Sequence, residues 1–192
     1  YKEAELYTRK AIELNPNLPI GHSNLGNILR DLGNLKEAEI CQRKAIELNP
    51  EFAEAYSNLG IILDDLGNFE EAELSSRKAI ELNPNFANGH SNLGGILRNL
   101  GRLKEAELST RKAIELNPNC AAAHSNLGNI LIDLGKSQEA EKYQRKAIEL
   151  NPKDALLHSN LGGILKNLGR LKEAELSIKK AIELDPNNAD FF

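Results

Sequence analysis

Six prolines recur at a fixed interval of 34 residues along this chain of 192 residues. They are Pro16, Pro50, Pro84, Pro118, Pro152 and Pro186. Most of the residues between them recur at the same interval, so the sequence consists of copies of one helix–turn–helix unit. Units of this length pack mainly on their neighbours and need no central core. The period therefore predicts an all-α solenoid of antiparallel helix pairs and argues against most enzyme folds.

The repeat places the unit boundaries and leaves the chain as a single array. Residues 1–18 form a half unit with only a second helix, and residues 189–192 begin a further unit. The full units are 19–52, 53–86, 87–120, 121–154 and 155–188. Solenoids need polar terminal caps, and neither end of this chain supplies one. We therefore expect a fragment of a longer array, whose isolated copies stack head to tail through open ends.

Each unit should contain two helices, at about 20–32 and 34–48 in the first full unit. Gly33 is placed to end the first helix, because glycine adopts the left-handed conformation past a helix end most readily. The second helix should end at Asn49, because the residue before a proline is disfavoured in a helix. The connection between the helices is short, so the two helices must pack antiparallel.

Composition argues against several classes of partner. The formal net charge is −4, and charged residues make up an ordinary 27% of the chain. These charges are spread evenly, so we expect no nucleic acid and no anionic membrane among the partners. The longest apolar runs cover only a few residues, too few to span a membrane. Cys41 and Cys120 lie in non-adjacent units and different columns of the repeat, which favours free thiols in a reducing cytoplasm.

The histidines and serines of the repeat do not form a catalytic or metal site. His22, His90, His124 and His158 occupy one column, so consecutive histidines belong to different helix pairs. Helix axes lie about 8–10 Å apart, and such rings cannot share an ion that needs bonds of about 2 Å. The serine that follows each histidine faces another direction, because neighbours at i and i+1 do not face each other on a helix. We expect no enzyme activity, no metal and no cofactor, and we expect the histidines to pack between helices.

The repeated residues resemble the tetratricopeptide repeat (TPR) family over essentially the whole chain. The resemblance rests on Leu25-Gly26, Gly33, Ala38, Ala45 and Pro50 and on their counterparts in every unit. It implies a right-handed superhelix whose first helices line a concave groove that binds peptides or protein segments, without catalysis. The sequence departs from the family where an aromatic column of the second helix is replaced. That column holds Gln42, Ser76, Thr110, Gln144 and Ile178.

An asparagine recurs at one position of the first helix in every full unit. The column consists of Asn24, Asn58, Asn92, Asn126 and Asn160. Asparagine is a mediocre helix former, so five copies at one position need a reason. A carboxamide both donates and accepts hydrogen bonds, which suits the backbone of an extended polypeptide. The alternatives are a ladder that only satisfies neighbouring groups or water, and simple inheritance by duplication.

The column also resembles the asparagine ladder in the TPR region of O-linked N-acetylglucosamine transferase, and similar arrays occur in bacterial proteins. There the asparagines face the groove and bind the polypeptide backbone. Other positions on the same face would complete a mixed, mildly acidic groove here. They are Ser57, Ser91, Ser125, Asn27, Asn129, Arg30, Arg98 and Asp65.

These observations predict a cytoplasmic, non-catalytic scaffold that binds an extended polypeptide through the asparagine column. Two other functions fit the same sequence. The array could be the substrate-recognition arm of a larger enzyme such as a glycosyltransferase, or a structural array that associates with copies of itself.

Overall fold

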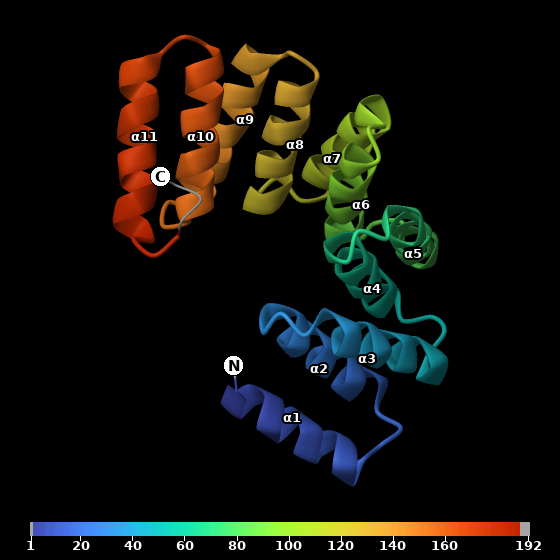
Figure 1. Cartoon of the computed structure of the whole chain (residues 1–192). Helices are drawn as coiled ribbons and strands as arrows, with labels where there is room; N and C mark the ends of the chain where they lie inside the picture. Colours follow the sequence, from blue (N-terminus) through green and yellow to red (C-terminus); the bar gives the residue numbers. More distant parts are fainter. Residues whose placement is uncertain (1, 189–192) are drawn as a thin grey trace. The chain divides into compact units, whose positions relative to one another are not determined.

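A computed structural model describes residues 2–188, which form eleven α-helices and no strand (Figure 1). The helices are α1 (Lys2–Leu14), α2 (Pro19–Asp31), α3 (Leu35–Leu48), α4 (Ala53–Asp65), α5 (Phe69–Leu82), α6 (Ala87–Asn99), α7 (Leu103–Leu116), α8 (Ala121–Asp133), α9 (Ser137–Leu150), α10 (Ala155–Asn167) and α11 (Leu171–Leu184). Residues 189–192, predicted to begin a further unit, lie outside the described residues. The chain divides into two compact halves, residues 1–100 and 101–192.

The ends of the helices follow the local chemistry of the repeat. The helix α2 ends at Asp31, and Gly33 then takes a φ of +81° in the left-handed region. The equivalent glycines of the other four units have φ between 73° and 78°. The helix α3 ends at Leu48, two residues before Pro50. The predicted stop signals are therefore confirmed, and both helix boundaries lie within one residue of those expected.

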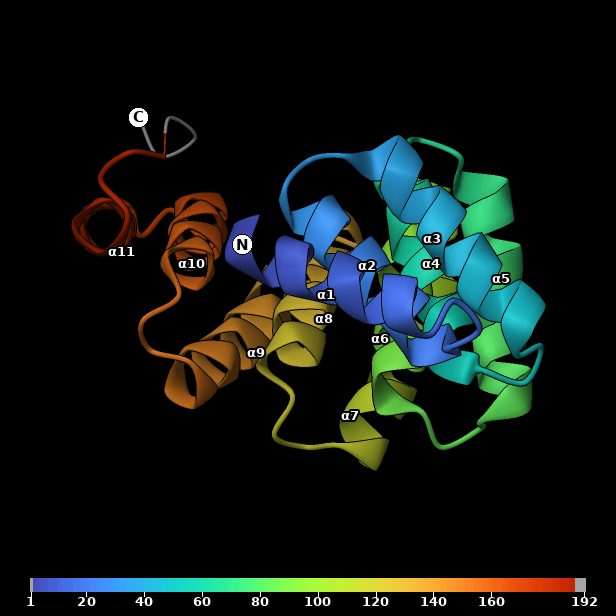
Figure 2. The same ribbon diagram turned by 90° about the horizontal axis from the view of Figure 1, so that it is seen from below.

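Consecutive helices pack as pairs. Within residues 1–100, α2 pairs with α3 and α4 pairs with α5. Within residues 101–192, α8 pairs with α9 and α10 pairs with α11. Figures 1 and 2 both show α10 and α11 side by side, joined by a short loop. The alanines of the second helix, such as Ala38 and Ala45, have no exposed surface and allow this close approach. The chain is thus an all-α solenoid of antiparallel helix pairs, as its period predicts.

The core is continuous from pair to pair within each half. Leu25, Leu29 and Ala38 of the first full pair form one buried cluster with Ile62 of α4. The isoleucine column of the first helices therefore packs against the preceding pair. Each pair thus buries its apolar side chains against its neighbours, which is the source of stability in a solenoid.

Polar residues occupy buried positions in the column of the second helix where the resemblance implies aromatic side chains. Gln42, Ser76 and Gln144 have no exposed surface. They fit because the facing position on the first helix is glycine. A Cβ on Gly60 would lie 2.3 Å from Oγ of Ser76 and 3.1 Å from the backbone oxygen of Ala72. The glycine of the first helix therefore lets the second helix approach closely, with its polar side chain against the glycine backbone.

Candidate functional site

The first helices carry the repeated Ser-Asn-Leu-Gly segment at the edge of the core. The leucine of the segment is buried, as Leu25 and Leu59 show, and so is the serine that precedes the asparagine in Ser23 and Ser57. The asparagines lie at the boundary between core and solvent. Asn24 is exposed, and Asn58, Asn92, Asn126 and Asn160 are partly exposed. The asparagine column thus borders the buried core and is still accessible to solvent.

Hydrogen bonds connect this column from one repeat to the next. Nδ2 of Asn58 donates to Oγ of Ser23 at 3.3 Å, and Nδ2 of Asn92 donates to Oγ of Ser57 at 3.0 Å. In the second half Nδ2 of Asn160 donates to Oγ of Ser125 at 3.3 Å. Each bond joins the first helices of neighbouring pairs. One alternative for the column was a ladder of asparagines that hydrogen-bond to neighbouring groups of the protein. The structure contains such bonds, and the partner of each asparagine is a serine side chain.

In Asn58, Asn92 and Asn160 this bond uses only part of the hydrogen-bonding capacity of the carboxamide. A carboxamide carries two N–H donors and one acceptor oxygen, and the serine engages only one donor. Because Ser57 and Ser125 are themselves buried, they orient the asparagines and do not line the surface. Ser91 is buried in the same way. Ser57 and Ser125 thus contribute to this face through the asparagines that donate to them.

Two further asparagines, Asn27 and Asn129, lie near the column on the same face, at a repeat position that the other full units fill with isoleucine or glycine. Oδ1 of Asn27 accepts a hydrogen bond of 2.9 Å from Nε2 of Gln42, which also donates to the backbone oxygen of Ser23 at 2.9 Å. Gln42 of the second helix, which is fully buried, therefore orients Asn27 from the side of the core. Asn129, at the same repeat position in the second half, is partly exposed.

Charged residues complete this face in the first half. Nε of Arg30 on α2 lies 2.6 Å from Oδ2 of Asp65 on α4. Nδ2 of Asn99 on α6 donates to both oxygens of Asp64, at 2.9 and 3.1 Å. Burial raises the pKa of the Asp64 carboxyl, and the neighbouring charge of Asp65 raises it further, whereas the hydrogen bond from Asn99 lowers it. Arg98, the other predicted cation in this half, is partly exposed on α6.

A shallow, mostly polar hollow lies between α2 and α4. Its volume is about 210 Å³, and it is lined by Asn27, Arg30, Asp31, Asn58 and Ile61. Pockets for drug-sized molecules usually measure about 300–1,000 Å³. The hollow suits one side chain or a short stretch of backbone better than a whole small molecule. The structure therefore brings three predicted site residues together here, namely Asn27, Arg30 and Asn58.

The histidine column has a role that the sequence did not reveal. In each case Nε2 lies 2.8–3.0 Å from the backbone oxygen of a proline in the preceding loop. The pairs are His22 with Pro16, His90 with Pro84, His124 with Pro118 and His158 with Pro152. The histidine therefore fastens the loop between two units to the helix that follows. Within residues 2–188 no three histidine, cysteine or acidic side chains gather in a group able to hold a metal ion.

The hydrogen bond from Asn99 provides a test of the electrostatics of this face. We expect Asn99→Ala to raise the pKa of Asp64 further, because the variant removes the hydrogen bond that lowers it. Because the pKa of Asp64 is raised in the folded state, its protonated form stabilises the fold at pH values below the unfolded-state pKa. This stability is lost as the pH rises through the folded-state pKa. NMR titration of the Asp64 carboxyl carbon measures the shift, with Asn34→Ala as the control. An unchanged or lower pKa in Asn99→Ala would contradict the assignment.

Four models of the tetratricopeptide repeat match the chain, at residues 17–85, 87–120, 121–154 and 155–188. No curated protein is a significant sequence match to this chain. No helix among the described residues combines the length and the hydropathy that a membrane span requires.

Three solved structures are similar to this chain. TTC0263, a thermophilic TPR protein of Thermus thermophilus, is 25% identical, with a TM-score of 0.82 over 90% of this chain and 94% of its own. YrrB, described as a TPR protein with an unusual peptide-binding site, is 28% identical, with a TM-score of 0.61 over 94% of this chain and 93% of its own. The APC/C hetero-tetramer Cut9–Hcn1 shares the fold at 18% identity, with a TM-score of 0.91 over 99% of this chain and 38% of the matched chain.

Proposed function

Because the chain belongs to the tetratricopeptide repeat family, we propose that it is a non-catalytic protein–protein interaction scaffold. In this proposal it binds an extended polypeptide segment across the asparagine column of its first helices. The observation that carries the proposal is the repeated carboxamide, oriented by a buried serine and still open to solvent. The peptide-binding site named for YrrB, which is similar over nearly its whole length, supports the same class of ligand.

The spacing of the column suits an extended chain. Packed helices lie about 8–10 Å apart, and an extended polypeptide advances about 3.3–3.6 Å per residue. A segment that crosses α2, α4 and α6 would therefore meet one asparagine about every three residues. Each carboxamide can pair with a peptide group whatever the side chain, so the column would supply affinity with little sequence selectivity.

Selectivity would come from the residues that flank the column. Arg30 and Asp65 neutralise each other through their ion pair, so this part of the face demands no strongly charged ligand. The hollow beside Asn58 accepts a side chain that can bond to amide and guanidinium groups. We therefore expect a preference for segments with small polar or weakly charged side chains.

The experiment is a selection from a phage-displayed library of linear peptides, followed by fluorescence polarisation with the selected peptides. We expect the double variant Asn58→Ala/Asn92→Ala to weaken binding by about tenfold or more, because each lost hydrogen bond contributes about 0.5–1.5 kcal/mol. The matched control is Asn34→Ala/Asn68→Ala, which removes two exposed asparagines of the same half that make no side-chain cap hydrogen bond. Unaltered binding by the first variant, with its helical circular dichroism retained, would refute the proposal.

A further inference from the structure

The hollow between α2 and α4 is lined by an asparagine whose carboxamide has a fixed orientation. Nε2 of Gln42 donates to the backbone oxygen of Ser23 at 2.9 Å, and a backbone oxygen can only accept. The same nitrogen donates to Oδ1 of Asn27 at 2.9 Å, so the protein itself engages that oxygen. The group that Asn27 can offer to the hollow is therefore its Nδ2 donor.

The other polar residues of the hollow supply a second donor and two acceptors. Arg30 uses Nε in its ion pair with Asp65, and within residues 2–188 its Nη atoms have no hydrogen-bond partner. Asn58 donates to Ser23 and keeps its oxygen as an acceptor. Asp31 is exposed and forms no ion pair with a described residue, so its carboxylate is the second acceptor.

This set of groups matches a primary carboxamide in number and kind. A primary carboxamide has two N–H donors and an oxygen with two lone pairs. Its oxygen can accept from Asn27 and Arg30. Its two N–H groups can donate to Asn58 and Asp31. A carboxylate has no donor, a lysine ammonium has no acceptor, and a backbone peptide group has only one N–H. Each of these would leave polar groups of the hollow unpaired, which weakens binding.

We propose that the hollow binds the side-chain carboxamide of a glutamine or asparagine in the bound polypeptide. This inference rests on the proposed function, because it names a side chain of the segment that crosses the asparagine column. Ile61 forms an apolar part of the lining, against which the methylene groups of a glutamine can pack. Arg30 and Asp31 together favour a neutral group, since a charged group of either sign would face a like charge.

The hollow would also set the register of the bound segment. The asparagines of the column recur in every full unit, so by themselves they allow the segment to shift by one repeat. The position of Asn27 differs in this respect, because its residue varies between units. The other full units hold Ile61, Gly95, Asn129 and Gly163 there. A glutamine bound beside Asn27 would therefore favour one register over the others.

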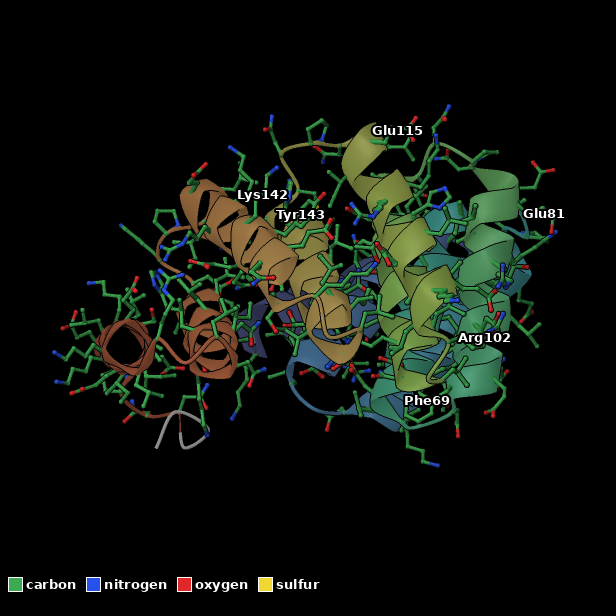
Figure 3. The ribbon with its side chains drawn as sticks, turned by 90° about the horizontal axis from the view of Figure 1, so that it is seen from above. Phe69, Glu81, Arg102, Glu115, Lys142 and Tyr143 are labelled. Carbon is green, nitrogen blue, oxygen red and sulfur yellow. The ribbon has the colours of Figure 1, made fainter. Side chains whose placement is uncertain are left out.

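The unit at residues 121–154 repeats the asparagine and the buried glutamine but not the hydrogen bond between them. Gln144, which follows Tyr143 on α9 (Figure 3), donates through Nε2 to the backbone oxygen of Leu157 at 2.8 Å. Its Oε1 atom has no partner among the described residues, so no bond from this glutamine orients Asn129. This unit thus offers a matched control, in which the same substitution is made away from the hollow.

A double-mutant cycle tests the proposal with the peptide most enriched from the phage-displayed library. We expect the enriched peptides to share one glutamine or asparagine, and its replacement by glutamate or leucine to weaken binding by about tenfold. Asn27→Ile should reduce this difference to about threefold or less, because the hollow has lost its fixed donor. Isoleucine occupies the same position in Ile61, so the helix tolerates it. The matched control, Asn129→Ile, should keep the full difference.

Gln42→Thr tests the orientation of Asn27 without removing Asn27 itself. Thr110 occupies the equivalent position and donates to the backbone oxygen of Ala106 at 2.9 Å, so threonine fits this column. We expect Gln42→Thr to bind the leucine peptide as the wild type does and to bind the parent peptide less tightly. A purely structural effect of Gln42 would instead change the affinity for both peptides alike, which would contradict the proposal.

The possible results separate this inference from the proposed function. The carboxamide assignment alone fails if the enriched peptides share a basic or acidic residue, or share no residue. It also fails alone if Asn27→Ile keeps the full preference or Asn129→Ile loses it. In these cases a loss of binding in Asn58→Ala/Asn92→Ala still supports the proposed function. A wild-type chain that enriches no peptide would refute both.

Discussion

Replacing Leu63 by alanine should lower the free energy of unfolding by about 2–5 kcal/mol, the usual range for a fully buried leucine. Leu63 has no exposed surface and packs with Leu59, Ala72 and Ile96. It therefore touches α4, α5 and α6 together. Alanine would leave a cavity at the point where one helix pair meets the next, and the two rigid neighbours could close it only partly.

The measurement is urea unfolding followed by circular dichroism, with Leu14→Ala as the control. Leu14 is 89% exposed, so its truncation should change stability by no more than about 0.5 kcal/mol. Because a solenoid transmits stability between nearest neighbours, hydrogen exchange in Leu63→Ala should rise first in α4, α5 and α6. Similar losses from the two variants would show that the buried row is not the source of stability.

Two adjacent glycines of α10 should respond to substitution in opposite ways. A Cβ on Gly162 would lie 2.6 Å from Cδ1 and 2.8 Å from Cγ1 of Ile178, whereas a Cβ on Gly163 meets no atom within 4 Å. We expect Gly162→Leu to destabilise the chain by about 1–3 kcal/mol, because the added side chain would force α10 and α11 apart. Gly163→Ala should stabilise it by about 0.5–1 kcal/mol, because alanine is the better helix former.

Thermal unfolding of both variants measures this difference. Gly163→Leu serves as the control for side-chain size, since it adds the same leucine where the space is open. If Gly162→Leu and Gly163→Leu were equally stable, close contact between the helices could not be the reason for glycine at position 162. A loss of stability in Gly163→Ala would likewise contradict the open space beside that position.

The interactions that the sequence predicted are those that depend on near neighbours in the chain. Helix ends followed from Gly33 and Pro50, because each acts on its own backbone. The buried leucines and alanines followed from helical periodicity.

The interactions that the sequence did not predict join groups from different helices. The bond from Asn58 to Ser23 spans 35 residues, and the ion pair of Arg30 and Asp65 also spans 35. The residue types were visible in the sequence, but the partner across the interface depends on the offset between successive pairs. The histidines were expected to pack between helices, and the hydrogen bond to a proline oxygen depends on the path of the preceding loop.

The exposed apolar residues of the second helices, such as Ile40 and Leu74, illustrate the same limit. In the sequence the charges of the second helix indicate a solvated surface, and the apolar residue among them stands out only when its exposure is known. Ile40 follows buried Ala38 by two positions, so the pattern alone does not decide which of the two turns away from the core. Tertiary packing settles this point, because α2 and α4 pack on the side of α3 that carries Ala38 and leave Ile40 exposed.

The amino-acid sequence by itself determined the helices, their 34-residue period and their antiparallel pairing, since these follow from backbone preferences and short connections. Only the tertiary structure decided which polar groups are held and which remain open to a ligand. Each asparagine of the column has the same local sequence, so its hydrogen bonding depends on contacts with the preceding repeat. Those contacts place a buried serine beside Asn58 and Asn92.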